Sequence, residues 1–139
     1  MGRLLIVDDE PNLRRVLGSD LRLDGHKIEE ADGVGSAVSL LAEHEYDAII
    51  TDQKMPDGDG LKVLTVAREN DPSVAVIFLT AVPTIELAVE SMRQGAFDFI
   101  TKPFNPEVVR ATVRRACERT GLLRENQLLK STVGTLQGA

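Results

Sequence analysis

Short, mostly apolar runs alternate along the chain with longer amphipathic segments, and this alternation constrains the fold more than any other feature. The apolar runs are Leu4–Val7, Ile28–Ala31, Ala48–Thr51, Val74–Leu79 and Phe97–Ile100. Helix-like patterns span about Leu13–Leu23, Val34–Ala42, Leu61–Arg68 and Ile85–Arg93, and a long one starts at Pro106. Most of the apolar runs are too hydrophobic for a sheet with one face in water, so they indicate parallel strands covered on both faces. The pattern predicts an α/β fold in which helices flank an open parallel sheet.

Asp-Gly pairs punctuate these segments, at Asp24-Gly25, at Asp32-Gly33 and in the run from Asp57 to Gly60. Such pairs can form β-hairpins. Because helical patterns lie beside them, we expect turns between strands and helices here, and no hairpin.

The composition suits one globular domain with a short appendage, since 139 residues with 42% hydrophobic content can bury a core. No apolar run approaches the roughly 20 residues of a membrane span, and the start lacks a signal-peptide core, so we expect a soluble, cytoplasmic protein. The net charge of −6 argues against direct nucleic acid contact by this segment. Cys117 is expected to pack, and His26 and His44 to lie at the surface.

Polar residues follow the predicted strands at their carboxyl ends: Asp8 and Asp9 after the first, Asp52 after the third, Thr80 after the fourth and Lys102 after the fifth. In an open α/β sheet, ligands bind beyond these ends, where the strand order reverses. For the order 2-1-3-4-5 the first and third strands are neighbours at that point. We therefore expect the three aspartates to converge, with Thr80 and Lys102 to one side.

Three carboxylates in one pocket repel each other, because one pair about 4 Å apart costs on the order of 4 kcal/mol at an effective dielectric constant of 20. Lys102 supplies one positive charge, and a divalent cation would cancel the remaining −2. Oxygen ligands without His or Cys favour a hard ion, and Mg²⁺, which also binds phosphate, fits best. The site therefore suits phosphoryl transfer, with Asp52 as the nucleophile that forms an aspartyl-phosphate. Lys102 and the Thr80 hydroxyl would contact phosphoryl oxygens.

Each of these residues, taken singly, also has a structural interpretation. Asp9 or Glu10 could be an acid at a helix N-terminus. Asp52 could be a turn aspartate, Thr80 a strand-end hydroxyl, and Lys102 a solvated surface residue. Their joint position at the ends of the appropriate strands favours the functional interpretation.

The patterns VDDE, ITDQKMPDGDGL, FLTAV and FDFITKPF resemble the response-regulator receiver domain over about residues 3–118. The resemblance implies the (βα)5 flavodoxin-like fold and a signalling domain that accepts a phosphoryl group on Asp52 from a histidine kinase. It implies no enzyme beyond the domain's own phosphorylation and dephosphorylation. It also implies Mg²⁺ held by Asp9, Asp52 and the backbone carbonyl of Lys54, with Asp8 acting through water.

The same resemblance implies two further features near the site. One is a cis peptide bond at Lys102-Pro103, although an X-Pro bond in general is cis only about 5% of the time. The other is a switch role for Phe99, whose ring would move inward as Thr80 turns towards the phosphate.

A heptad-like seam with spacing 4-3-4-3 continues past the expected end of the domain, at Leu122, Asn126, Leu129, Val133 and Leu136. Such a seam favours a two-stranded coiled coil, in which a polar residue helps to fix the register. Gly121 and Gly134 weaken the helix by about 1 kcal/mol each, so a frayed amphipathic tail is the alternative. We expect residues 1–118 to form the receiver and residues 119–139 a helical linker, in an extended C-terminal helix.

The stretch AVESMRQGAFDFITKPF, followed by LLRENQLL, resembles the receiver and linker of nitrogen-regulatory-protein-C-type, sigma-N-dependent activators. Such activators carry an ATPase domain and a DNA-binding domain downstream, and no GxxxxGK[ST] loop occurs in this sequence. The resemblance implies a piece of a transcriptional activator that homodimerises through its fourth and fifth helices and its C-terminal helix, under the control of phosphorylation.

Three other functions remain as alternatives. The strongest is a stand-alone receiver that acts by docking to another protein. A haloacid-dehalogenase-like phosphatase would use a nucleophile after the first strand in a DxD pattern, which Asp8-Asp9-Glu10 does not match. A flavodoxin-like nucleotide binder is disfavoured by the acidic residues at the strand ends.

Overall fold

The computed structural model describes the backbone of residues 2–138 and the side chains of residues 2–128. Five parallel strands form one sheet in the order β2-β1-β3-β6-β7. Their bounds are β1 (Arg3–Val7), β2 (Lys27–Ala31), β3 (Ala48–Thr51), β6 (Ala75–Thr80) and β7 (Asp98–Thr101). Numbered within this sheet alone, the order is 2-1-3-4-5, so the predicted α/β fold and strand order are confirmed.

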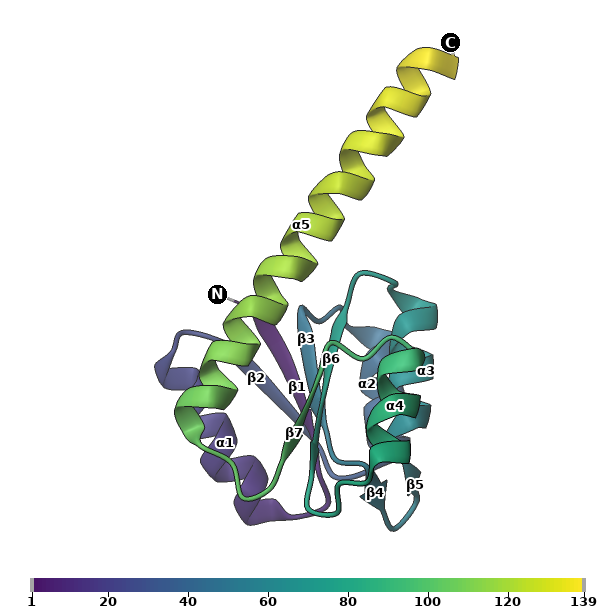
Figure 1. Ribbon diagram of the computed structural model, residues 1–139. Coiled ribbons are helices and arrows are strands. Elements are labelled where there is room, and N and C mark those ends of the chain that lie inside the picture. The colour runs from purple at the N-terminus through teal and green to yellow at the C-terminus, as the bar shows by residue number, and fades with distance from the viewer. Residues whose placement is uncertain (1, 139) are drawn as a thin grey trace.

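Helices cover both faces of the sheet (Figure 1). One face carries α1 (Pro11–Leu23) and α5 (Pro106–Gly138), and the other carries α2 (Val34–Glu43), α3 (Gly60–Asn70) and α4 (Ile85–Arg93). Strand β1 shows why the strand segments are apolar. Leu4 and Ile6 pack in the core beneath α1 and α5. Leu5 and Val7 pack in the core beneath α2 and α3. Alternate residues of a strand face opposite sides, so both sets must be apolar.

A small antiparallel hairpin interrupts the connection between β3 and α3, formed by β4 (Lys54–Met55) and β5 (Gly58–Asp59). The expectation that no Asp-Gly pair forms a hairpin is therefore wrong here. Helix α3 begins only at Gly60, which leaves room for the hairpin before it. Gly58 has φ +154°, a conformation open to glycine, and Met55 is buried beneath the hairpin.

His26 is buried, contrary to the expectation of a surface position, with only 7% of its area exposed. Its Nδ1 accepts a hydrogen bond from the backbone N–H of Gly2 at 3.0 Å. Burial lowers the pKa of His26, which favours the neutral ring that such an acceptor requires. His44, by comparison, is partly exposed.

Helix α5 continues past the sheet as one helix to Gly138, as predicted for the extended C-terminal helix (Figure 1). Beyond residue 118 it still contacts the domain, because the Thr120 hydroxyl donates to the Asp47 carbonyl at 2.7 Å. Arg124 then donates to the Asp47 carboxylate at 2.5 Å and to the Asp71 carboxylate at 2.8 Å. We call Arg124, Asp47 and Asp71 the arginine clasp.

The arginine clasp joins the amino ends of two central strands to the helix, since Asp47 precedes β3 and Asp71 precedes β6. Arg124 also donates to the Tyr46 carbonyl at 2.7 Å and to the Ser73 hydroxyl at 3.2 Å. Helix α5 is therefore fixed to the domain as far as Arg124. The division into a receiver at 1–118 and a linker at 119–139 stays a prediction about domain organisation.

The predicted dimer seam lies mostly beyond the described side chains. Leu122 and Asn126 are exposed, with 65% of Leu122 accessible. Leu129, Val133 and Leu136 lie outside the residues whose side chains are described, so the seam stays a prediction. Among the described residues, none of the helices combines the length and apolarity needed to span a bilayer.

Arg124→Gln should lower the free energy of unfolding by about 1–2 kcal/mol, because the variant loses charge-assisted hydrogen bonds to two carboxylates. Burial would raise the pKa of Asp71, but hydrogen bonds from Ser73 and Arg124 outweigh burial and hold it below its usual range. The stabilisation is therefore complete above the ordinary carboxyl pKa of about 4 and declines as the pH falls through the lower folded-state value. Urea unfolding at pH 7 and at pH 3 measures both effects.

The matched control is Arg114→Gln, at an exposed arginine of the same helix. It should change the free energy of unfolding by less than about 0.5 kcal/mol. An equal loss in both variants, or an Arg124→Gln deficit that is undiminished at pH 3, would contradict a role for the clasp.

Candidate functional site

Three aspartates converge beyond the carboxyl ends of β1 and β3. These strands are hydrogen-bonded neighbours in which Val7 pairs with Thr51, so the residues that follow emerge side by side. Carboxylate oxygens of Asp8, Asp9 and Asp52 all lie within 4.8 Å of one another. Across the described residues, no other group of three or more acidic, histidine or cysteine side chains comes together in this way. We call these three residues the acidic cluster.

Lys102 lies within reach of two members of the acidic cluster. Its Nζ is 3.0 Å from Oδ2 of Asp8 and 3.4 Å from Oδ2 of Asp52. All three side chains are largely withdrawn from water, with exposed fractions of 15% for Lys102, 3% for Asp8 and 14% for Asp52. Buried ion pairs are weakly screened, so Lys102 holds these carboxylates in place strongly.

The backbone around Lys102 directs its side chain to the cluster. The N–H of Lys102 donates to the Thr80 carbonyl at 2.7 Å, which continues the pairing between β6 and β7 by one residue. The following Lys102-Pro103 peptide bond is cis.

The charges in this group shift each other's titration. Burial raises the pKa of Asp52, and the neighbouring Asp8 raises it further, against the opposing effect of Lys102. Burial alone would lower the pKa of Lys102, but the two aspartates outweigh burial and raise it. Lys102 thus remains charged, while the acidic cluster keeps an excess of negative charge that a cation would relieve.

Asp8 is fixed by further hydrogen bonds in the turn after β1. Its Oδ1 accepts from the N–H of Glu10 at 2.9 Å, and its carbonyl accepts from Arg14 at 2.5 Å. Glu10 is the N-cap residue of α1 but makes no side-chain capping hydrogen bond. Asp9 is exposed beside Asp8 and faces the solvent at the mouth of the site.

A small hollow of about 130 Å³ opens next to Asp52, lined by Asp52, Gln53, Lys54, Thr80, Ala81 and Val82. Thr80 is only 3% exposed, and its hydroxyl oxygen accepts from the N–H of Val82 at 3.3 Å. Its O–H hydrogen remains available to donate to a ligand in the hollow. Lys54 lies on the exposed edge of the β4–β5 hairpin.

Phe99 lies on β7 directly opposite Phe78 of β6. The ring centroids are 6.3 Å apart and the ring planes meet at 33°. Phe99 is half-buried and packs at the edge of the core beneath α2 and α3. Its ring has both an inner packing surface and access to solvent, and its switch role stays a prediction.

Sequence reasoning missed three residues that fix the backbone next to Asp52. Asp59 caps α3 by accepting from the N–H of Leu61 at 2.9 Å, and the buried Gln53 amide donates to Asp59 at 3.1 Å. Gly60 approaches the site backbone so closely that a Cβ there would lie 2.2 Å from the Asp52 carbonyl oxygen. The Asp-Gly-Asp-Gly run carries this signal, because it places a capping acid beside a glycine at a helix start.

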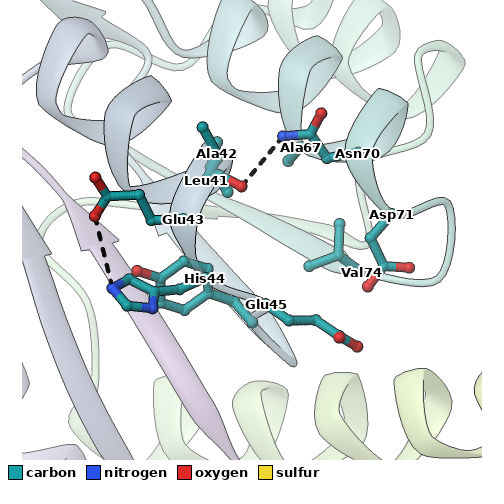
Figure 2. Close-up of a pocket in the computed structure, with 10 residues that line it drawn as sticks. Leu41, Ala42, Glu43, His44, Glu45, Ala67, Asn70, Asp71 and Val74 are labelled. Carbon is teal, nitrogen blue, oxygen red and sulfur yellow. Dashed lines mark hydrogen bonds and ion pairs between the residues drawn. The ribbon is translucent and has the colours of Figure 1, made fainter.

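A larger hollow, of about 640 Å³, lies at the opposite edge of the sheet (Figure 2). It is lined by residues that precede β3 and β6, among them Glu43, His44, Glu45 and Asp71. Figure 2 shows Asn70 donating to the Leu41 carbonyl across it, at 3.2 Å. This hollow contains no member of the acidic cluster, so size alone does not identify the functional site.

Comparison with known protein families identifies one match, to the family described as the response regulator receiver domain, over residues 4–114. Among curated proteins, the chain is 36% identical over 135 residues to the regulatory protein AtoC of Escherichia coli strain K12, covering 97% of this chain and 29% of AtoC. The chain therefore spans less than a third of the length of that relative.

Solved structures give the same result. The NtrX protein of Brucella abortus, crystallised with ATP, matches with a TM-score of 0.85 and 30% identity over 92% of this chain and 29% of that chain. The beryllofluoride-activated NtrC4 receiver domain dimer, solved in solution, matches with a TM-score of 0.80 and 32% identity over 85% of this chain and 98% of that chain.

Gly60→Ala should lower the free energy of unfolding by roughly 2–3 kcal/mol or more, because its Cβ would collide with the Asp52 backbone and with the Phe78 ring. Gly121→Ala is the matched control, since a Cβ there meets nothing within 4 Å. In the middle of α5 that substitution should instead stabilise the protein by about 0.5–1 kcal/mol. Thermal unfolding of both variants measures the difference, and equal melting temperatures would refute the close approach of Gly60.

Proposed function

Because this chain belongs to the response regulator receiver domain family, we propose that Asp52 accepts a phosphoryl group from a sensor histidine kinase in a reaction that depends on Mg²⁺. The observation that carries the proposal is the acidic cluster with Lys102 among it, where Asp8, Asp9 and Asp52 share one site within 4.8 Å. Mutual repulsion makes such a cluster unfavourable unless positive charge binds there.

The donor set fits a hard divalent cation. Three carboxylates and one lysine leave a net charge of −2, and the surrounding donors are oxygen atoms. Asp9, Asp52 and the backbone carbonyl of Lys54 would hold the ion, with Asp8 acting through water. When bound, the ion would neutralise charge on the phosphoryl oxygens.

In the transfer step, a carboxylate oxygen of Asp52 attacks the phosphorus of a phosphohistidine on the kinase. A P–O bond forms as the P–N bond breaks, and the leaving imidazole keeps the electron pair and is protonated from the solvent. Lys102 Nζ and the Thr80 hydroxyl neutralise and orient the transferred oxygens.

The burial of Asp8 argues against a phosphatase of the haloacid dehalogenase type, which would need the nucleophile after the first strand. The Asp8 side chain is only 3% exposed, compared with 14% for Asp52, and Asp8 does not line the small hollow next to Thr80. Asp52 lies beside the small hollow next to Thr80, where a phosphoryl group could bind. The product of the proposed reaction is thus the phosphorylated receiver itself, whereas a phosphatase would release a dephosphorylated substrate.

We further propose that this receiver controls a cytoplasmic transcriptional activator of the nitrogen-regulatory-protein-C type. The similarity to AtoC extends over 97% of this chain, so it includes most of the α5 extension. Phosphorylation would favour a homodimer formed through α4 and α5, with an ATPase domain and a DNA-binding domain downstream in the full-length protein. The alternative, a stand-alone receiver, is not supported by this similarity along the extended helix.

An exposed apolar stripe on α4 supports the dimer face. Ile85, Val89 and Met92 follow the spacing of one helix face and are 82%, 49% and 48% exposed. Val108, at the start of α5, is 49% exposed. Covering such a surface with a second copy removes apolar area from water. The NtrC4 receiver, which was solved as a dimer in its beryllofluoride-activated form, provides a precedent.

Incubation with acetyl phosphate and Mg²⁺ should add the mass of one phosphoryl group to the protein. Asp52→Asn should abolish the addition, and Lys102→Ala should slow it by at least about tenfold, because one cation at the phosphoryl oxygens is lost. Intact mass spectrometry and peptide mapping measure both effects. Labelling that persists on Asp8 in the Asp52→Asn variant would favour the phosphatase alternative.

Beryllofluoride with Mg²⁺ should shift the protein towards a dimer in sedimentation velocity. Val89→Asp should weaken that dimer by at least about tenfold in the dissociation constant, because it places a charge in an apolar contact. Truncation after Leu128, which retains the arginine clasp, separates the contribution of the tail. If Val89→Asp and the parent dimerise equally, α4 is not the interface.

A further inference from the structure

The β4–β5 hairpin carries the Lys54 carbonyl of the proposed metal site, yet most of the hairpin is exposed. Lys54, Pro56, Asp57 and Gly58 all lie at the surface, and only Met55 is buried beneath them. A short, solvent-exposed hairpin is not stable by itself. Contacts with the rest of the domain must therefore fix its position.

Asp57 makes such a contact with a helix that is distant in the sequence. Its Oδ1 accepts from the N–H of Val34 at 2.9 Å, and its Oδ2 accepts from the N–H of Gly35 at 3.0 Å. These are the first two residues of α2, whose N-cap residue, Gly33, has no side chain to cap it. The carboxylate thus satisfies two otherwise unpaired helix N–H groups and faces the positive end of the helix dipole. These two hydrogen bonds lower the pKa of Asp57.

Gly33 is matched to this contact. A Cβ on Gly33 would lie 2.6 Å from Oδ1 and 2.9 Å from Oδ2 of Asp57, too close for both to stay in place. The backbone does not require glycine here, because its φ of −176° is extended and open to any residue. The missing side chain therefore makes room for the Asp57 carboxylate.

The other residues of the hairpin point to the same close fit. A Cβ on Gly58 would lie 3.1 Å from the Val34 side chain, so the hairpin packs directly on the first turn of α2. Lys54 pairs with Asp59 and Met55 with Gly58, which puts Pro56 and Asp57 at the turn. Holding the turn therefore also holds Lys54 at the other end of this short ladder.

We propose that Asp57 is a positioning residue for the metal site: by fastening the hairpin to the N-terminus of α2, it holds the Lys54 carbonyl where a bound cation would need it. This inference rests on the proposed function. Prearrangement matters because a ligand held in place before binding loses little conformational freedom when the ion binds. Without Asp57, part of the binding free energy would be spent on ordering the hairpin.

Asp57→Ala should weaken Mg²⁺ binding roughly threefold to tenfold, measured by isothermal titration calorimetry in the absence of any phosphodonor. Asp57→Asn should give an intermediate value, because the amide keeps one acceptor oxygen out of two.

The matched control is Asp32→Asn, which removes the same charge beside the same helix start. Asp32 accepts from the Ser36 hydroxyl and makes no contact with the hairpin in the hydrogen bonds of the described residues. The Mg²⁺ affinity of the Asp32→Asn variant should stay within about twofold of that of the parent protein.

Gly33→Ala tests the contact from the other side. Its Cβ should displace the Asp57 carboxylate, so it should weaken Mg²⁺ binding as Asp57→Ala does and should speed amide exchange at Val34 and Gly35. In the Asp57→Ala background, Gly33→Ala should have no further effect, because the contact is already lost. Additive effects of the two substitutions would overturn the proposal, as would an unchanged Mg²⁺ affinity in Asp57→Ala.

The Mg²⁺ dependence of labelling by acetyl phosphate separates positioning from a general loosening of the fold. In Asp57→Ala the half-saturating Mg²⁺ concentration should rise, while the maximal rate at saturating Mg²⁺ should stay within about twofold of the parent. A lower maximal rate with an unchanged half-saturation would overturn the proposal. If the parent itself is not labelled on Asp52, the proposed function fails, while calorimetry and amide exchange still report on the Asp57 contact.

Discussion

The ion pairing of Lys102 with buried carboxylates is the constraint on which the rest of the site depends. Asp8 and Asp52 lie 3.0 and 3.4 Å from one ammonium group, in surroundings that raise the pKa of Asp52. One lysine cannot balance three aspartates, so the site keeps a negative excess that favours a cation and, with it, a phosphoryl group. The fold contributes by bringing the ends of three strands to one edge.

A second charged centre lies at the other end of strand β3. Asp47 precedes β3 and pairs with Arg124, whereas Asp52 follows β3 and pairs with Lys102. Strand β3 between them is buried along its whole length and is hydrogen-bonded on both sides. The four strand residues thus form a stiff connection between the phosphorylation site proposed here and the helix that leaves the domain.

Much of this architecture could be predicted because it depends on short-range patterns. Apolar runs of strand length indicate a sheet buried on both faces, and the placement of acids after strands β1 and β3 indicates their convergence at a switch point. The structure confirms the α/β class and the strand order, and the family comparison confirms the receiver family, which was predicted from a resemblance in sequence motifs. The roles of the individual site residues and the coiled-coil seam stay predictions, as does the Phe99 switch, which rests on resemblance.

The contacts that sequence reasoning missed join residues distant in the chain. Arg124 meets Asp71 across 53 residues, and Asp57 meets Val34 across 23. The buried position of His26 depends likewise on Gly2, 24 residues away. The residues next to each member of such a pair in the sequence do not identify its distant partner. Sequence reasoning therefore treats an isolated charge as a solvated surface residue, which is the usual case.

The sequence by itself determined which segments become strands and helices and which acids lie at the strand ends, because apolar periodicity and local turn chemistry act over a few residues. Only the tertiary structure decided that a hairpin forms after Asp52, that Asp57 caps the start of α2, and that Arg124 ties α5 to the amino ends of β3 and β6. Those contacts depend on where separate elements come to lie after the core has packed. The distances and directions between elements are set by that packing, and local sequence does not encode them.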